Sequence, residues 1–156
     1  MNLIEVKSGE KVIAKIKKLT EKQVVKLKGN RKFQFDWSKE SKNEVYALLK
    51  KDNNEILGLV SIIYVPEELR VHLNLIESSI ANQGKHKLID GIPGCLIGYV
   101  CEISFKQGYD GFVSLLSKTR LVDYYHDKFG FVHMGNYMVV FLELSQAIIT
   151  KYLKNG

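Results

Sequence analysis

The first half of the chain contains three segments in which apolar and polar residues alternate, a pattern typical of half-buried β-strands. The predicted strands cover residues 44–51, 56–65 and 69–79. The short segments between them are rich in Asp, Asn and Pro, which favour turns, so we expect an antiparallel meander. In the last strand, strict alternation places four side chains on one face: Val71, Leu73, Leu75 and Glu77.

Three further patterns precede the meander. A short strand is expected over residues 3–6, and apolar residues at helical spacing predict a helix over residues 12–27, with Thr20 as a possible start inside it. Residues 33–37 (Phe-Gln-Phe-Asp-Trp) then alternate aromatic and polar side chains, which suits a docked extended segment. These aromatic residues either pack beneath a loop or line a substrate cleft.

The second half predicts a strand, a loop, a helix and a further strand in succession. An apolar helix over residues 96–106 follows the loop 91–95, and a strand is expected over residues 111–117. A second helix ends in the segment 124–131, and a hairpin (131–134 and 137–144) leads to a terminal helix over residues 146–153, with Ser145 as its N-cap. Such a βαβ-like unit places helix N–H groups beside strand ends, where an anion can bind.

Composition limits the class of protein. The chain has 156 residues, of which 46% are hydrophobic and 26% charged, so we expect a single α+β domain over residues 1–156. The apolar runs are too short to span a bilayer, and the first residues lack the form of a signal peptide. We therefore expect a cytoplasmic protein with no membrane partner.

The cysteines and the net charge offer little chemistry on their own. Cys95 and Cys101 lie within or next to one predicted helix at a spacing that matches no metal motif, so we expect reduced residues and no metal. The net charge of +6 makes an acidic partner worth considering. No nucleic-acid recognition motif accompanies that charge, and nucleic acid is therefore an unlikely partner.

The order of elements and three motifs resemble the GNAT-type N-acetyltransferases, in particular a small, poorly described, bacterial-type group. The motifs are Phe35-Asp36-Trp37, a Gly-Ile-Pro-Gly-x-Leu-Ile junction beginning at Gly91, and a Gly-Tyr-x-Gly-Phe-Val segment beginning at Gly108. The resemblance implies a mixed, mostly antiparallel sheet flanked by helices, with two strands separated around the βαβ-like core. It also implies acetyl transfer from acetyl-CoA to an amine of a small molecule or peptide, and allows a homodimer.

The resemblance places the acetyl-CoA site at the separated strands and at the loop before the apolar helix. The residues implied to contact the cofactor are Ile76, Ser78, Gly91, Ile92, Gly94, Cys95, Leu96 and Lys118. Asp90 is expected to cap the helix. The loop departs from the family pattern, which would have a basic or amide residue at Ile89 and a glycine at Ile92. A glycine-rich corner without a ligand would look similar.

The catalytic residues implied by the resemblance are a proton donor and a general base. The family carries a tyrosine about four residues before the glycine that matches Gly130, where this chain has His126 and, one residue earlier, Tyr125. We rank Tyr125 first as the acid for the CoA thiolate, His126 second and Tyr124 third, although both tyrosines suit plain packing roles. Glu77 is the expected base.

Two other functions remain open from the sequence. The first is a catalytically inactive binding module with the same fold, which would bind CoA or another protein. The second is a nucleic-acid-associated or ribosome-associated basic protein, which rests on charge alone.

Overall fold

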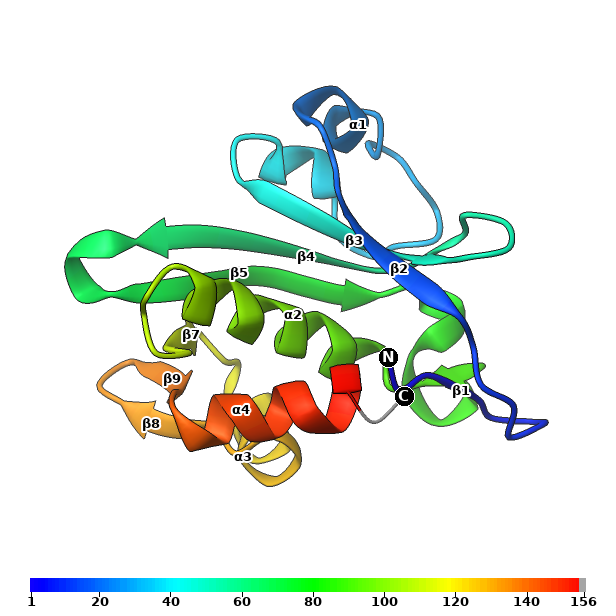
Figure 1. The fold of residues 1–156 in the computed structure, drawn as a ribbon. Coiled ribbons are helices and arrows are strands. Elements are labelled where there is room, and N and C mark those ends of the chain that lie inside the picture. Colours follow the sequence, from blue (N-terminus) through cyan, green and yellow to red (C-terminus); the bar gives the residue numbers. More distant parts are fainter. Residues whose placement is uncertain (155–156) are drawn as a thin grey trace.

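The computed structural model describes residues 1–154 and shows a seven-stranded mixed sheet flanked by helices (Figure 1). Its strand order is β2-β3-β4-β5-β7-β9-β8, and every neighbouring pair is antiparallel except β5 and β7. Strands β1 and β6 pair separately. The strands are β1 (Ile4–Glu5), β2 (Ala14–Lys18), β3 (Glu44–Lys50), β4 (Ile56–Val65), β5 (Arg70–Ser78), β6 (Ile89–Asp90), β7 (Val113–Leu115), β8 (Val132–Met134) and β9 (Tyr137–Val140).

Helices cover both faces of this sheet. The helices are α1 (Glu21–Val25), α2 (Ile92–Lys106), α3 (Val122–Phe129) and α4 (Glu143–Ile149), the last continued by a π-helical turn (Thr150–Lys154). Figure 1 shows α2, α3 and α4 on one side of the sheet and α1 on the other. A large apolar core lies beneath α2, and a smaller one lies beneath α1 around the buried Trp37. The predicted fold class is confirmed.

The predicted meander is also confirmed, with one irregularity that alternation alone does not reveal. In the β4–β5 pairing, Ser61 lies opposite Leu75 and Ile62 lies opposite Leu73, so Asn74 is an extra residue in β5. After a β-bulge of this kind, each side chain lies on the face opposite to the one that strict alternation predicts. Leu73 therefore packs in the core beneath α2, whereas Leu75 packs against the core on the other face. The prediction that Glu77 shares a face with Leu73 is wrong.

The predicted helix over residues 12–27 is wrong. Residues Ala14–Lys18 form an edge strand paired with β3, and α1 begins only at Glu21. Thr20 caps that helix in a capping box with Gln23, as the sequence suggested. Lys15 and Lys17 alternate with apolar residues, so this segment fits the period of a strand as well as that of a helix. Its pairing with β3 makes it a strand.

The observed bounds of three other elements differ from the predicted ones. Helix α2 begins at Ile92, four residues earlier than predicted, and its N-cap is Gly91 rather than Asp90. Helix α4 begins at Glu143, so Ser145 lies within it and donates its hydroxyl hydrogen to the Gly111 carbonyl instead of capping the helix. Residue 37 begins a short 3₁₀ helix (Trp37–Glu40) capped by Asp36.

Candidate functional site

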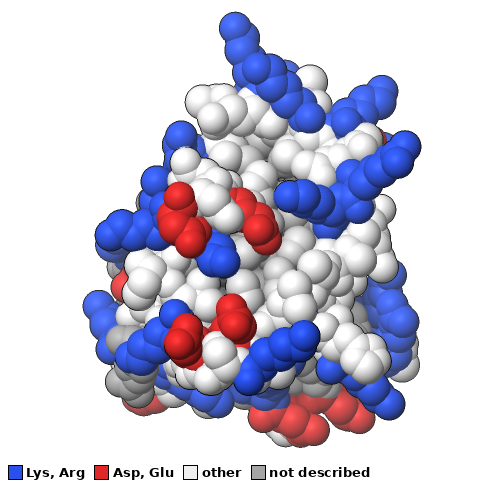
Figure 2. Space-filling model, turned by 90° about the vertical axis from the view of Figure 1, so that its right-hand side faces the viewer, with Lys and Arg blue, Asp and Glu red and all other residues white. Residues whose placement is uncertain are grey.

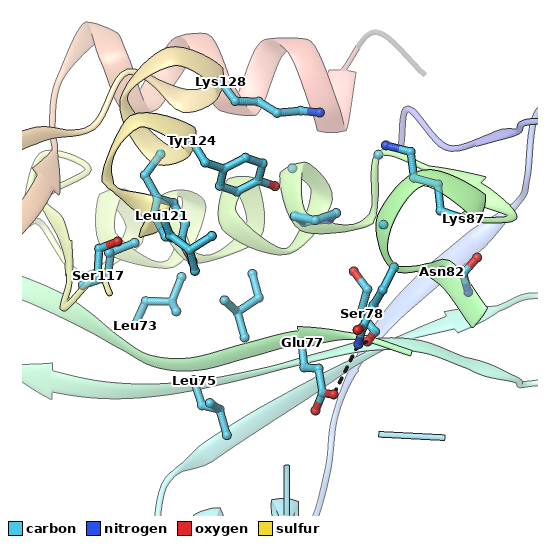
Figure 3. Close-up of a pocket in the computed structure, with 18 of the residues that line it drawn as sticks. Leu73, Leu75, Glu77, Ser78, Asn82, Lys87, Ser117, Leu121, Tyr124 and Lys128 are labelled. Atoms are coloured by element: carbon cyan, nitrogen blue, oxygen red, sulfur yellow. Dashed lines mark hydrogen bonds between the residues drawn. The ribbon is translucent and has the colours of Figure 1, made fainter. Parts of the chain in front are cut away.

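Strands β5 and β7 are paired over two residues only and then separate. Val71 lies beside Val113 and His72 beside Ser114, after which β5 continues to Ser78 without a strand partner on that side. A cavity of about 730 Å³ occupies the separation. It extends from the end of β5 and the residues after β7 to the first turn of α2 and to α3 (Figure 3).

Five of the eight predicted cofactor residues line this cavity, and three do not. The lining residues are Ile76, Ser78, Gly91, Gly94 and Lys118. Ile92, Cys95 and Leu96 are fully buried in the core beneath α2. Burial raises the pKa of the Cys95 thiol to about 11, and its Sγ donates a hydrogen bond to the Tyr152 carbonyl 3.5 Å away. The thiol is therefore protonated at neutral pH and sequestered.

The two glycines at the start of α2 are required by the protein's own packing. Gly91 has a φ of +102°, which disfavours other residues, and a Cβ there would overlap the Asn2 carbonyl. A Cβ at Gly94 would overlap the ring of Tyr152. The Asn2 N–H also donates to the Tyr152 carbonyl at 2.7 Å, so residues from both ends of the chain meet at this turn.

The charged groups around the cavity are predominantly cationic. Lys87 and Asp90 form an ion pair at 2.9 Å, which lowers the pKa of the Asp90 carboxyl. Four further cations line the cavity and have no ion pair among the described residues: Lys118, Arg120, Lys128 and Lys151. Figure 2 shows one end of the molecule, with Lys and Arg projecting from its upper part and both signs of charge mixed lower down.

Helix α3 directs two tyrosines to the cavity. The Tyr125 ring is 9% exposed and packs against Phe129 and Phe131, whereas Tyr124 is partly exposed and points into the cavity (Figure 3). Burial is the main cause that raises both phenol pKa values, that of Tyr124 to about 12. Both hydroxyls therefore remain protonated at neutral pH. His126 is exposed and lies outside the cavity lining, with its Nδ1 3.0 Å from the Phe131 carbonyl.

The carboxylate of Glu77 is engaged with a distant segment of the chain. It accepts hydrogen bonds from the backbone N–H groups of Gln34 and Phe35, from the Trp37 indole, and from the Gln83 amide. Glu77 borders the cavity, but its side chain points away from α2 (Figure 3). The structure thus separates Glu77 from the tyrosines by placing them on opposite sides of β5.

Sequence reasoning did not single out Lys128 and Lys151 as cavity residues. Lys128 follows Tyr124 by four residues, so the two share a helix face, and this spacing was an available signal. Lys151 offered no comparable signal, because its position depends on how the C-terminal turn packs over Gly94.

Residues 1–154 contain neither a metal-type cluster nor a membrane-spanning helix. No three His, Cys, Asp or Glu side chains there are grouped as a metal site would require. Within the same residues, no helix has the length and apolar character needed to cross a membrane.

Known structures resemble this fold although the sequences have diverged widely. No protein-family model matches the chain, and no curated protein matches it. The spermidine/spermine N-acetyltransferase SpeG from Vibrio cholerae matches over 91% of this chain and 97% of its own, with a TM-score of 0.59 and 15% identity. The IAA acetyltransferase from Bacillus cereus matches over 79% of each chain, with a TM-score of 0.55 and 15% identity.

A third match is AtaTR bound with AcCoA, which covers 88% of this chain and 98% of that one at 12% identity and a TM-score of 0.59. At such identities, the likeness concerns the fold. The neighbours are GNAT acetyltransferases, and this chain shares with them the mixed sheet flanked by helices. The chain therefore has the GNAT fold.

Proposed function

We propose that the protein is an N-acetyltransferase that binds acetyl-CoA between β5 and β7 and transfers its acetyl group to an amine. The observation that carries the proposal is the separation of these strands after His72 and Ser114, which opens a cavity between the start of α2 and the tyrosines of α3. A protein of the same fold with AcCoA bound supports the choice of co-substrate.

The residues of the cavity fit the chemistry of CoA. An extended pantetheine chain can hydrogen-bond to the β5 edge beyond His72, which has no strand partner, as an added strand would. The phosphates would be held by the unpaired cations Lys128 and Lys151 and by the N-terminal turn of α2, whose dipole favours negative charge. The thioester supplies the activated acetyl group.

The transfer forms a bond between the amine nitrogen and the acetyl carbon and breaks the bond between that carbon and sulfur. The departing thiolate needs a proton, which a protonated phenol supplies. We assign this role to Tyr125, because it belongs to the same apolar cluster as Leu73 and Leu115, where the strands part. Tyr124 instead points into the cavity between α3 and the start of α2 (Figure 3). The substrate ammonium loses one proton to water before the attack. The second proton, released from the nitrogen as the amide forms, returns through water to the Tyr125 phenolate.

Calorimetric titration of the purified protein with acetyl-CoA and with CoA tests the proposal. We expect saturable binding with a dissociation constant in the micromolar range, about −8 kcal/mol. A panel of amines, with release of free thiol as the signal, then identifies the substrate. Absence of binding at millimolar concentration would contradict the proposal, and binding without turnover on any amine would favour an inactive CoA-binding module.

A further inference from the structure

Glu77 is a buried carboxylate whose four hydrogen bonds all come from outside its own strand. Only 6% of the surface of Glu77 is exposed. Oε1 accepts from the Trp37 indole at 2.9 Å and from the Phe35 N–H at 3.3 Å. Oε2 accepts from the Gln34 N–H at 2.6 Å and from the Gln83 amide at 3.3 Å. Three of these four donors lie on one short segment, residues 34–37, about forty positions earlier in the chain.

These hydrogen bonds occupy all the acceptor sites of the carboxylate. A carboxylate has about four lone-pair sites, and four donors fill them. To accept a proton from an amine, Glu77 would first have to release at least one of these donors. For the buried Trp37 indole, the loss would leave an unsatisfied group at a cost of about 1–3 kcal/mol. The position of Glu77 on the face away from α2 adds to this separation from the tyrosines (Figure 3).

The segment held by Glu77 contributes an apolar side chain to the cavity. Phe35 lies between Gln34 and Trp37, whose N–H groups both donate to Glu77. Its side chain lines the cavity, and 45% of the residue's surface is exposed. Trp37 is 1% exposed within the smaller core, so the segment is anchored on both sides of Phe35. Lys118, from the other side of the separation, places its Nζ 6.0 Å from the Phe35 ring centroid.

We propose that Glu77 is a positioning residue: it holds residues 34–37 against the end of β5 and so fixes Phe35 as the cavity wall on the face opposite α2. The amine substrate binds against this wall, an assignment that rests on the proposed acetyltransferase function. Glu77 itself does not accept the proton of the amine. The hydrogen-bonding role is independent of catalysis and can be measured without it.

The test uses Trp37, the only tryptophan of the chain, as an internal probe. Glu77→Gln keeps the size of the side chain but replaces one accepting oxygen with an NH₂ group, which cannot satisfy the donors on that side. We expect a red shift of Trp37 emission, greater quenching by acrylamide, and at least tenfold faster hydrogen exchange of the Gln34 and Phe35 amides. Glu44→Gln is the matched control: Glu44 is a partly buried carboxylate that accepts from Tyr46 and Tyr64 and has no bond to this segment.

Kinetics separate positioning from proton transfer. In Glu77→Gln, we expect the KM for the amine to rise at least fivefold, while the pH profile of kcat keeps its acidic limb and the affinity for CoA is unchanged. Phe35→Ala should raise the same KM without altering Trp37 emission. Loss of the acidic limb with an unchanged KM and unchanged Trp37 emission would identify Glu77 as the base and overturn the proposal.

One measurement needs no variant and covers the case in which Glu77→Gln fails to fold. In the wild-type protein, the Gln34 and Phe35 amides should exchange at least a hundredfold more slowly than an unstructured peptide, although they lie in a loop. Exchange at the unprotected rate would overturn the proposal. If the wild-type protein shows no turnover, the proposed function fails, and the exchange and fluorescence results still decide the role of Glu77.

Discussion

Tyr125 and Tyr124 are neighbours on α3 with different surroundings. The Tyr125 ring is nearly buried among Phe129 and Phe131, while Tyr124 is partly exposed in the cavity. A phenol held rigidly in an apolar cluster keeps its proton until a strong base, such as a thiolate, forms beside it.

We therefore expect Tyr125→Phe to lower kcat by about 100-fold while leaving the dissociation constant for CoA unchanged, since general acids contribute about 10²- to 10⁴-fold. Tyr124→Phe is the matched control and should lower kcat less than fivefold. Both variants are compared by thiol release and calorimetry. A larger kcat loss in Tyr124→Phe would transfer the role to Tyr124.

His72 lies on β5 within a small polar cluster. Its Nδ1 is 2.9 Å from the Ser114 hydroxyl and 3.4 Å from the guanidinium of Arg70, which also donates to Ser114 and lies over the Tyr137 ring. Burial, and then the charge of Arg70, lower the pKa of His72 below its usual 6.5. The folded protein thus holds this imidazole neutral where an unfolded chain would begin to protonate it.

This lowered pKa predicts a loss of stability on mild acidification. Below pH 6.5 the unfolded chain binds a proton at His72 before the folded protein does, so the free energy of unfolding falls as the pH drops from about 7 to 5. The pKa values of Asp36 and Asp90 are lowered from 3.8, so these carboxyls titrate outside that window. Urea unfolding at both pH values should show a smaller decrease for His72→Asn, and an equal decrease would contradict the assignment.

At the scale of elements, the start of α2 depends on contact with the C-terminal turn. The ring of Tyr152 covers Gly94, while the Asn2 carbonyl lies against Gly91. The chain's own residues therefore explain these glycines, whether or not a phosphate also approaches them.

We expect Gly94→Ala to lower the free energy of unfolding by about 1–3 kcal/mol through overpacking against Tyr152. Adding Tyr152→Leu to that variant should recover part of the loss, because the two sites are coupled. Gly98→Ala serves as the control, since a Cβ there lies 3.3 Å from the flexible Leu153 side chain. Thermal or urea unfolding compares these variants with Tyr152→Leu alone and with the wild-type protein. Equal losses at Gly94 and Gly98 would refute the overpacking, and purely additive losses in the double variant would refute the coupling.

The elements that sequence reasoning predicted well are those with local signals. Strands β3, β4 and β5 are bounded by turn residues and alternate clearly, and Thr20 marked the start of α1. The strand at Ala14–Lys18 was missed because a lysine-rich segment fits either period, and its pairing with β3 is a long-range fact.

The candidate site was predictable in outline only. The separated strands, the Gly91 turn and the tyrosines of α3 were expected, but the rotation of α3 that excludes His126 from the cavity depends on packing. The bonds of Glu77 join residues about forty positions apart. No local pattern in β5 indicated the extra residue Asn74.

For the whole molecule, the net charge of +6 is partly concentrated as unpaired cations along the cavity. A ligand that binds only the folded protein stabilises it by about 2.7 kcal/mol at a hundred times its dissociation constant. CoA should therefore raise the melting temperature, and by less as salt screens the phosphates.

Lys128→Ala and Lys151→Ala should each weaken CoA binding about tenfold, or about 1.4 kcal/mol. Lys106→Ala is the control, since Lys106 is exposed at the far end of α2. Calorimetry at two salt concentrations measures the affinities. Equal affinity in all three variants would mean that the phosphates lie elsewhere.

The extra residue in β5 changes the face of the sheet on which each following side chain lies. Upstream of Asn74, odd-numbered side chains face α2; downstream, they face the opposite side, where Glu77 meets residues 34–37. If β5 kept all its residues but alternated strictly, the downstream rows would be exchanged, turning the carboxylate toward α2 and Ile76 toward Trp37. Deleting Asn74 would instead remove the bulge and leave both rows on their present faces. The wall at Phe35 thus depends on Asn74 remaining unmatched, because strict alternation over the same number of residues would turn Glu77 away from residues 34–37.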